Sequence, residues 1–126
     1  PASMGPAVYR LYVVEIDDPR GHVPYSFYVG HTKQEVEDRV QEHQEGGLRS
    51  ARIFKREGVS PGSIRYDLFD GLPRYRCKAC AENAEGRLAR VIEAQAGRAK
   101  SDMTDNRKKG AVRPCEGRVA SEGATG

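Results

Sequence analysis

The 126-residue sequence predicts an α/β protein of the α+β type, in which helices flank a small, mostly antiparallel three-stranded sheet. Two observations lead to this prediction. Two segments rich in strand-forming residues lie close together near the start of the chain, and segments with helical periodicity follow them. The expected order is strand, strand, helix, helix, strand, helix, because a small sheet needs helices to cover its apolar surface.

Residues 8–16 and 26–30 are the first two predicted strands. The first is rich in β-branched and aromatic residues. Residues 17–24 connect the two and contain several turn-forming Asp, Pro and Gly residues. We therefore expect an antiparallel hairpin that brings Tyr12 and Tyr28 onto neighbouring strands. Because side chains alternate along a strand, Phe27 and Val29 should face one side of the sheet and Tyr28 the other.

The first predicted helix follows the hairpin. Residues 32–35 (Thr-Lys-Gln-Glu) are typical of a capping box, and Gly46-Gly47 should end the helix. Spacings of three and four place one set of side chains on a shared face: Val36, Arg39, Val40 and His43. Two interpretations stay open. Arg39 and His43 could simply border an apolar stripe, or they could join the two phenols in an anion-binding patch near the helix N-terminus.

The remaining elements are shorter or less regular. Residues 50–58 predict a second helix, capped by Ser50 and stopped by Gly58. The alternation of Ile64, Tyr66 and Leu68 predicts a third strand. Residues 72–78 should form a loop before the third helix. On that helix one face holds Glu85, Leu88, Ala89 and Ile92, which would point Glu85 inward at the margin of the core.

Length and composition indicate one domain, expected over residues 8–97. Residues 1–7 are interpreted as an expression remnant or N-terminal extension, and residues 98–126 as a basic, polar C-terminal extension. The net charge of +3 is modest, but this last segment holds many Lys and Arg residues. It could be a solvated tail or an arm that follows phosphates. With no membrane-spanning apolar stretch and no secretory signal, we expect a cytoplasmic protein.

The hairpin and its following helix resemble the GIY-YIG nuclease family. The segment Arg10-Leu11-Tyr12 stands where that family has its first motif, and Tyr28-Val29-Gly30 stands where it has the second. The family's first motif has glycine and isoleucine in place of Arg10 and Leu11. The loop between the two tyrosines is also longer than the family's usual connection. The resemblance covers roughly residues 8–97 and rests on the combination of motifs.

Three later residues extend the resemblance. Arg39 matches the arginine of the family's helix, and His43 matches the histidine that many members carry one turn later. Glu85 matches the glutamate that the family places on a later helix. Glu82, one turn earlier, is the alternative. The resemblance implies five catalytic residues: Tyr12, Tyr28, Arg39, His43 and Glu85.

The activity implied by the resemblance is metal-dependent hydrolysis of phosphodiester bonds in DNA. Glu85 would hold one Mg²⁺ or Mn²⁺ ion per site, and Arg39 would clamp the phosphate. The general base would be Tyr12, which needs its pKa lowered from about 10, or His43, whose intrinsic pKa is better matched. Three residues would have supporting roles: Lys33, His31 and Asn106.

The expected partner is DNA, with no membrane association. Substrate choice would come from a homodimer, a separate specificity partner or basic surfaces, for which the sequence offers Arg49, Arg52, Lys55, Arg56, Lys108 and Lys109. Two alternatives are a non-cleaving nucleic-acid-binding module of the same fold and a small zinc- or thiol-based interaction protein. Cys77, Cys80 and Cys115 are too few for a four-cysteine zinc site, so free thiols are expected.

Overall fold

Four strands form a mixed sheet in residues 8–103, the part of the chain that the computed structural model describes. They are β1 (Arg10–Asp17), β2 (Phe27–Thr32), β3 (Ser60–Ile64) and β4 (Ala99–Lys100), in the spatial order β3-β1-β2-β4. β1 pairs antiparallel with β2 and β3, whereas β4 runs parallel to β2. The α+β class is as predicted, but the sheet has a fourth, parallel strand and is not three-stranded.

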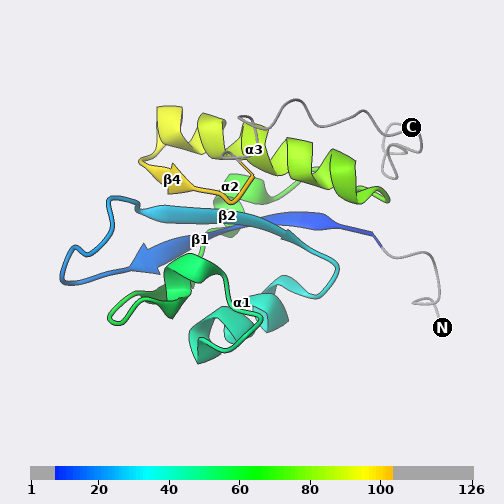
Figure 1. Cartoon of the computed structure of the whole chain (residues 1–126). Helices are drawn as coiled ribbons and strands as arrows, with labels where there is room; N and C mark the ends of the chain where they lie inside the picture. The colour runs from blue at the N-terminus through cyan, green and yellow to red at the C-terminus, as the bar shows by residue number, and fades with distance from the viewer. Residues whose placement is uncertain (1–7, 104–126) are drawn as a thin grey trace.

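Helices lie on both faces of this sheet. The described residues form α1 (Val36–Glu45), the single 3-10 turn η2 (Arg52–Lys55), the short α2 (Tyr66–Phe69) and the long α3 (Lys78–Gln95). Figure 1 shows α3 on one side of the β1–β2 pair and α1 on the other. No helix within residues 8–103 combines the length and the apolar character needed to cross a membrane.

Alternation along β1 and β2 sends side chains into two hydrophobic cores. Val13, Phe27 and Val29 face α3 and pack with Ala89 and Ile92. Tyr12, Val14 and Tyr28 face the opposite side. There they pack with side chains of α1, η2 and the adjoining loops, namely Val36, Val40, Ala51, Ile53, Phe54 and Val59. The predicted hairpin and its division of side chains between two faces are confirmed.

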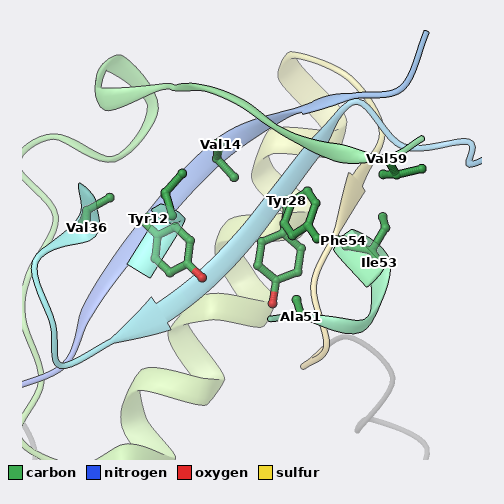
Figure 2. Packing of buried hydrophobic residues seen from close by; sticks show 9 residues of the cluster. Tyr12, Val14, Tyr28, Val36, Ala51, Ile53, Phe54 and Val59 are labelled. Carbon is green, nitrogen blue, oxygen red and sulfur yellow. The ribbon is translucent and has the colours of Figure 1, made fainter. Parts of the chain in front are cut away.

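The two tyrosines lie close together on the α1 face. Their ring centroids are 6.2 Å apart, and in Figure 2 both phenol oxygens point away from Val14. Tyr12 is opposite Gly30 in the strand register, and its ring covers that glycine. A Cβ atom at Gly30 would lie 2.5 Å from the Tyr12 oxygen. The glycine is therefore required for Tyr12 to lie where it does.

The start of α1 differs from the prediction. Thr32 belongs to β2, and its hydroxyl accepts a hydrogen bond from the Gln34 N–H at 3.0 Å. The N-cap is Glu35, which makes no side-chain capping bond in the described structure. The predicted capping box is wrong because Thr32 continues the strand. The predicted end is right, since Gly46 caps α1 with a φ of 67°, a left-handed conformation that glycine adopts readily.

The second predicted helix and the third predicted strand also need correction. Residues 52–55 form one 3-10 turn, not a helix over 50–58, because the buried apolar residues, Ile53 and Phe54, amount to a single turn. Ile64 ends β3, and Tyr66 begins α2 instead of continuing a strand. β3 contains Pro61, which is tolerated because β3 is an edge strand and Pro lacks a ladder donor.

The domain extends beyond residue 97, where we expected it to end. In β4, Ala99 pairs with Phe27 and Lys100 pairs with Tyr28. Ala99 and Ser101 are both buried. Residues 98–103 are therefore part of the folded domain and not of a polar extension. Residues 1–7 and 104–126 lie outside the described part of the chain.

Candidate active site

A cavity of about 150 Å³ lies between the sheet and residues of two helices. Its lining residues come from β1, β2, α1, α3 and the segment after β4, and they are Tyr12, Tyr28, His31, Arg39, Glu85, Asp102 and Met103. Four of the five predicted catalytic residues therefore meet at one cavity. The structure also places His31, a predicted supporting residue, in the lining. Asp102 and Met103 are additions that the sequence did not suggest.

His43, the fifth predicted catalytic residue, lies behind Tyr12 and outside the cavity lining. It is 1% exposed, and its Nε2 lies 2.8 Å from the Tyr12 phenol oxygen. The other ring nitrogen, Nδ1, accepts a hydrogen bond from the Ala51 N–H at 3.0 Å. Because Nδ1 acts as an acceptor, the neutral ring carries its proton on Nε2 and donates it to Tyr12.

The charge state of His43 follows from its surroundings. Burial lowers the pKa of His43 to about 4, and the nearby Arg39 charge acts in the same direction. The imidazole is therefore neutral at pH 7. In that state it is a hydrogen-bond donor to the Tyr12 oxygen, so it does not accept the Tyr12 proton.

The two phenols differ in their hydrogen-bond partners. Burial raises the pKa of both above the ordinary value of 10.0, and for both the Arg39 charge opposes that rise. Tyr28 donates to Asp102 Oδ2 at 3.3 Å, whereas Tyr12 receives a hydrogen bond from His43. A donor and a nearby cation favour a phenolate, and a carboxylate acceptor disfavours it. Of the two phenols, Tyr12 is thus the one whose hydrogen-bond partner favours the phenolate, although burial raises the pKa of both.

Glu85 projects from α3 into the cavity wall and is 2% exposed. His31 Nδ1 lies 2.6 Å from Oε1, and the Ser101 hydroxyl donates to Oε2. Ser101 is held in turn by the Met103 N–H, which donates to its Oγ at 3.0 Å. Burial raises the pKa of Glu85, while the hydrogen bonds from His31 and Ser101 act against the rise. Glu82, the alternative, lies outside the cavity lining.

Two hydrogen bonds from one guanidinium nitrogen fix Arg39. Its Nη1 donates to Glu42 Oε1 and to the Arg49 carbonyl oxygen, in each case at 2.7 Å. The same guanidinium lines the cavity. A planar guanidinium held in this way can present its other N–H groups to the oxygens of a phosphate.

The remaining described residues with a predicted supporting or nucleic-acid-binding role do not line the cavity. The Lys33 ammonium lies 5.5 Å from the centre of the Tyr9 ring and outside the cavity lining. Four of the basic residues expected to bind nucleic acid are described and exposed, namely Arg49, Arg52, Lys55 and Arg56. They do not share a helical face, because η2 is a single turn. Asn106, Lys108 and Lys109 lie outside the described residues.

The oxygen atoms of the cavity suit a hard cation. Glu85 and Asp102 provide carboxylates, and Mg²⁺ and Mn²⁺ prefer such ligands and keep several waters. Residues 8–103 contain no group of three or more His, Cys, Asp or Glu side chains that could hold a metal ion. A cation here would therefore have one or two protein ligands, which fits a largely hydrated Mg²⁺ and not a closed zinc site.

The cysteines do not form a metal site in the described structure. Cys80 is a free thiol, as expected. Cys77 is disulfide-bonded, so the expectation of free thiols is wrong for this residue. A zinc ion held by the Cys77 and Cys80 thiolates would need both to be free. The zinc-based alternative therefore receives no support from these two residues.

Ser101, Asp102 and Met103 are the site residues that the sequence did not suggest. They follow a strand of two residues, which is too short to show any periodicity. Nothing in the local sequence pairs Ala99 with Phe27 or brings Asp102 to Tyr28. No protein-family model matches the sequence, and neither a curated protein nor a solved structure gives a match. Functional assignment therefore depends on the chemistry of the cavity.

Proposed function

We propose that this protein is a metal-dependent endonuclease that hydrolyses phosphodiester bonds in DNA, and that it is a single-domain relative of the GIY-YIG nucleases. One observation carries the proposal. Tyr12, Tyr28, Arg39 and Glu85 line a single cavity although they are spread over the chain. A motif match does not by itself require this convergence, so the shared cavity is independent support for it.

Arg39 would bind the scissile phosphate. Its contacts with Glu42 and the Arg49 carbonyl hold the guanidinium in place before the substrate arrives. Such preorganisation lowers the free-energy barrier because no reorganisation is needed when charge develops on the phosphoryl oxygens. The Tyr28 hydroxyl, on the same cavity wall, would hydrogen-bond the phosphate or the attacking water.

Tyr12 is the better candidate for the general base. His43 carries its proton on Nε2 and directs it at the Tyr12 oxygen, so it would stabilise a Tyr12 phenolate. The Arg39 charge favours the same form. The phenolate would take a proton from the attacking water, and His43 would keep its own proton throughout. The choice between Tyr12 and His43 thus favours Tyr12, with His43 as the positioning residue.

Glu85 would hold the cation, with His31 and Ser101 fixing the carboxylate orientation. A bound Mg²⁺ or Mn²⁺ would act as a Lewis acid and stabilise the leaving 3′ oxygen. Exposed basic residues on and beside η2 would contact neighbouring phosphates. One cavity cuts one strand, so breaking a duplex would need a homodimer, a second partner or two successive cuts.

A plasmid-nicking assay with Mg²⁺ or Mn²⁺ tests the proposal. Wild-type protein should convert supercoiled DNA to nicked DNA, and Glu85→Ala and Arg39→Ala should each reduce the rate at least about a hundredfold. Glu82→Ala is the matched control, because it removes a carboxylate from the same helix outside the cavity lining. Its rate should stay near that of the wild type.

Three results would count against the assignment. Absence of nicking on duplex, branched and single-stranded DNA would leave the non-cleaving binding module as the remaining nucleic-acid function. Full activity of Glu85→Ala would show that Glu85 is not the metal ligand. A loss of activity in Glu82→Ala with Glu85→Ala still active would transfer the role to Glu82.

A further inference from the structure

We propose that Asp102 makes phosphate binding at the cavity depend on the divalent cation, so that cation and DNA bind with positive coupling. This inference rests on the proposed function and adds to it a residue that the sequence did not suggest. In this view Asp102 both attracts the cation and keeps a phosphate away from the empty site. The carboxylate thus acts on the order and coupling of binding.

The position of Asp102 supports this role. It follows β4, lines the cavity, and accepts a hydrogen bond from the Tyr28 hydroxyl at 3.3 Å. It is exposed, whereas Glu85 in the same cavity is almost completely buried. A phosphate or a cation that enters from solvent would therefore meet the exposed Asp102 carboxylate before the buried Glu85 carboxylate.

The charges around the cavity also support this role of Asp102. Two of its lining residues, Glu85 and Asp102, are acids, and Arg39 is the arginine among them. Arg39 is already paired with Glu42 at 2.7 Å. His31 adds a positive charge only when it is protonated. A phosphodiester anion that approaches such a site meets a carboxylate whose repulsion Arg39 only partly offsets.

A divalent cation reverses this balance. Bound between the carboxylates and the phosphate, it would turn Asp102 from a group that repels the DNA into an indirect ligand for it. By linkage, a cation that increases the affinity for DNA is itself bound more tightly when DNA is present. The expected signs are opposite for the two ligands: Asp102 strengthens cation binding and weakens binding of DNA without the cation.

Two binding measurements on the full chain test these signs. The first measures cation binding by Tb³⁺ luminescence, because Tb³⁺ binds oxygen ligands and nearby tyrosines sensitise its emission. The chain contains no tryptophan that would interfere. Mg²⁺ and Ca²⁺ are titrated as competitors. Asp102→Asn should weaken cation binding about tenfold, as expected for removing one unit charge from a partly solvated site.

DNA affinity is then measured by fluorescence anisotropy of a labelled duplex, in EDTA and in Ca²⁺. Asp102→Asn should bind the duplex about threefold more tightly in EDTA, and its gain in affinity on adding Ca²⁺ should shrink. Asp17→Asn is the matched control, because it makes the same charge change at an exposed position at the far end of β1. It should change the Tb³⁺ signal little and tighten DNA binding less than Asp102→Asn.

The outcomes separate this inference from the proposed function. If Asp102→Asn binds cation and metal-free DNA as Asp17→Asn does, or if wild-type protein gives no sensitised Tb³⁺ luminescence, the role of Asp102 is overturned even when nicking is observed. If the opposite signs are found but no substrate is nicked, the coupling stands and the assignment as a nuclease fails.

Discussion

The Tyr12 phenol oxygen and His43 Nε2 are 2.8 Å apart, and the Ala51 N–H determines that His43 is the donor between them. The backbone amide uses the acceptor lone pair of Nδ1, so the neutral imidazole can only donate to Tyr12. This arrangement gives Tyr12 a fixed donor in a buried position. It also makes the neutral state of His43 part of the folded structure.

The buried His43 predicts a loss of stability in mild acid. Its pKa is about 4 when folded and 6.5 ordinarily, so between these values the unfolded chain binds a proton that the folded protein does not. The stability that the neutral His43 contributes to the folded state is complete above pH 6.5 and is lost as the pH falls toward 4. A difference of about 2.5 pKa units corresponds to about 3 kcal/mol.

Urea unfolding between pH 4 and pH 8 measures this contribution, since these limits bracket the ordinary and the lowered pKa. In His43→Gln, the fall in the free energy of unfolding toward acid should be smaller by about that amount. Burial raises the pKa of Glu85, so its contribution to stability changes with pH in the opposite sense, which makes the comparison between variants necessary. Equal pH slopes for wild type and His43→Gln would contradict a buried neutral imidazole.

A methyl group at Gly30 should disturb the site directly. The new Cβ would lie 2.5 Å from the Tyr12 oxygen and 2.6 Å from its Cζ, so the ring would have to move. We expect Gly30→Ala to lower the free energy of unfolding by about 1–3 kcal/mol and to weaken the His43 contact. The control is Gly47→Ala, since no atom lies within 4 Å of a Cβ there. Similar unfolding curves for both variants would show that Tyr12 does not require the space over Gly30.

Removing the charge of Glu85 should stabilise the fold while abolishing cleavage. Burial raises the pKa of Glu85, so the folded protein holds the carboxyl proton of Glu85 more tightly than the unfolded chain does. The stability of the wild type therefore falls as the pH rises from the ordinary pKa of a glutamate through the raised one. Glu85→Gln removes that loss because glutamine does not ionise. We expect a gain of about 1 kcal/mol at pH 8 that shrinks toward pH 4, measured by urea unfolding. Glu82→Gln is the control, and a loss of stability in Glu85→Gln at pH 8 would refute the prediction.

The geometry of Arg39, and not just its charge, should matter. Lysine keeps the charge but lacks the planar fork that contacts Glu42, the Arg49 carbonyl and the cavity together. We expect Arg39→Lys to reduce the nicking rate about a hundredfold, close to the effect of Arg39→Ala. Arg52→Lys, an exposed position, is the control. A wild-type rate in Arg39→Lys would mean that a positive charge alone is sufficient.

The hairpin and the long helix could be predicted because their signals are local. Alternation in residues 8–16 and 26–30 fixed which faces Tyr12, Tyr28 and Val29 occupy, and helical spacing placed Glu85 on the inner face of α3. Three cavity residues, Tyr12, Tyr28 and Glu85, followed from these elements, and Arg39 followed from the helical spacing of α1. The contact of Arg39 with the Arg49 carbonyl could not be foreseen, because it depends on the path of the loop after α1.

The errors arose where tertiary pairing overrides local pattern. Thr32 has a good capping sequence, but pairing with Arg10 keeps it in the strand. Pro61 and Gly62 argue against a strand, yet an edge position beside β1 accepts them. Ala99 forms a strand only because Phe27 offers a free edge, and this pairing decides where Ser101 and Asp102 lie. A single sequence contains no local signal for such distant partners.

The order in which the cavity residues are synthesised limits when the site can exist. Asp102 meets Tyr28 across 74 positions of sequence, and Ser101 reaches Glu85 only after α3 has turned back into β4. Chains emerge from the ribosome N-terminus first, so the hairpin and α1 can fold while the last contributors are still missing. A fragment released before residue 102 would carry the tyrosines and Arg39 without a finished site. For a nuclease of the proposed kind, cutting activity would therefore appear only after the whole domain has left the ribosome.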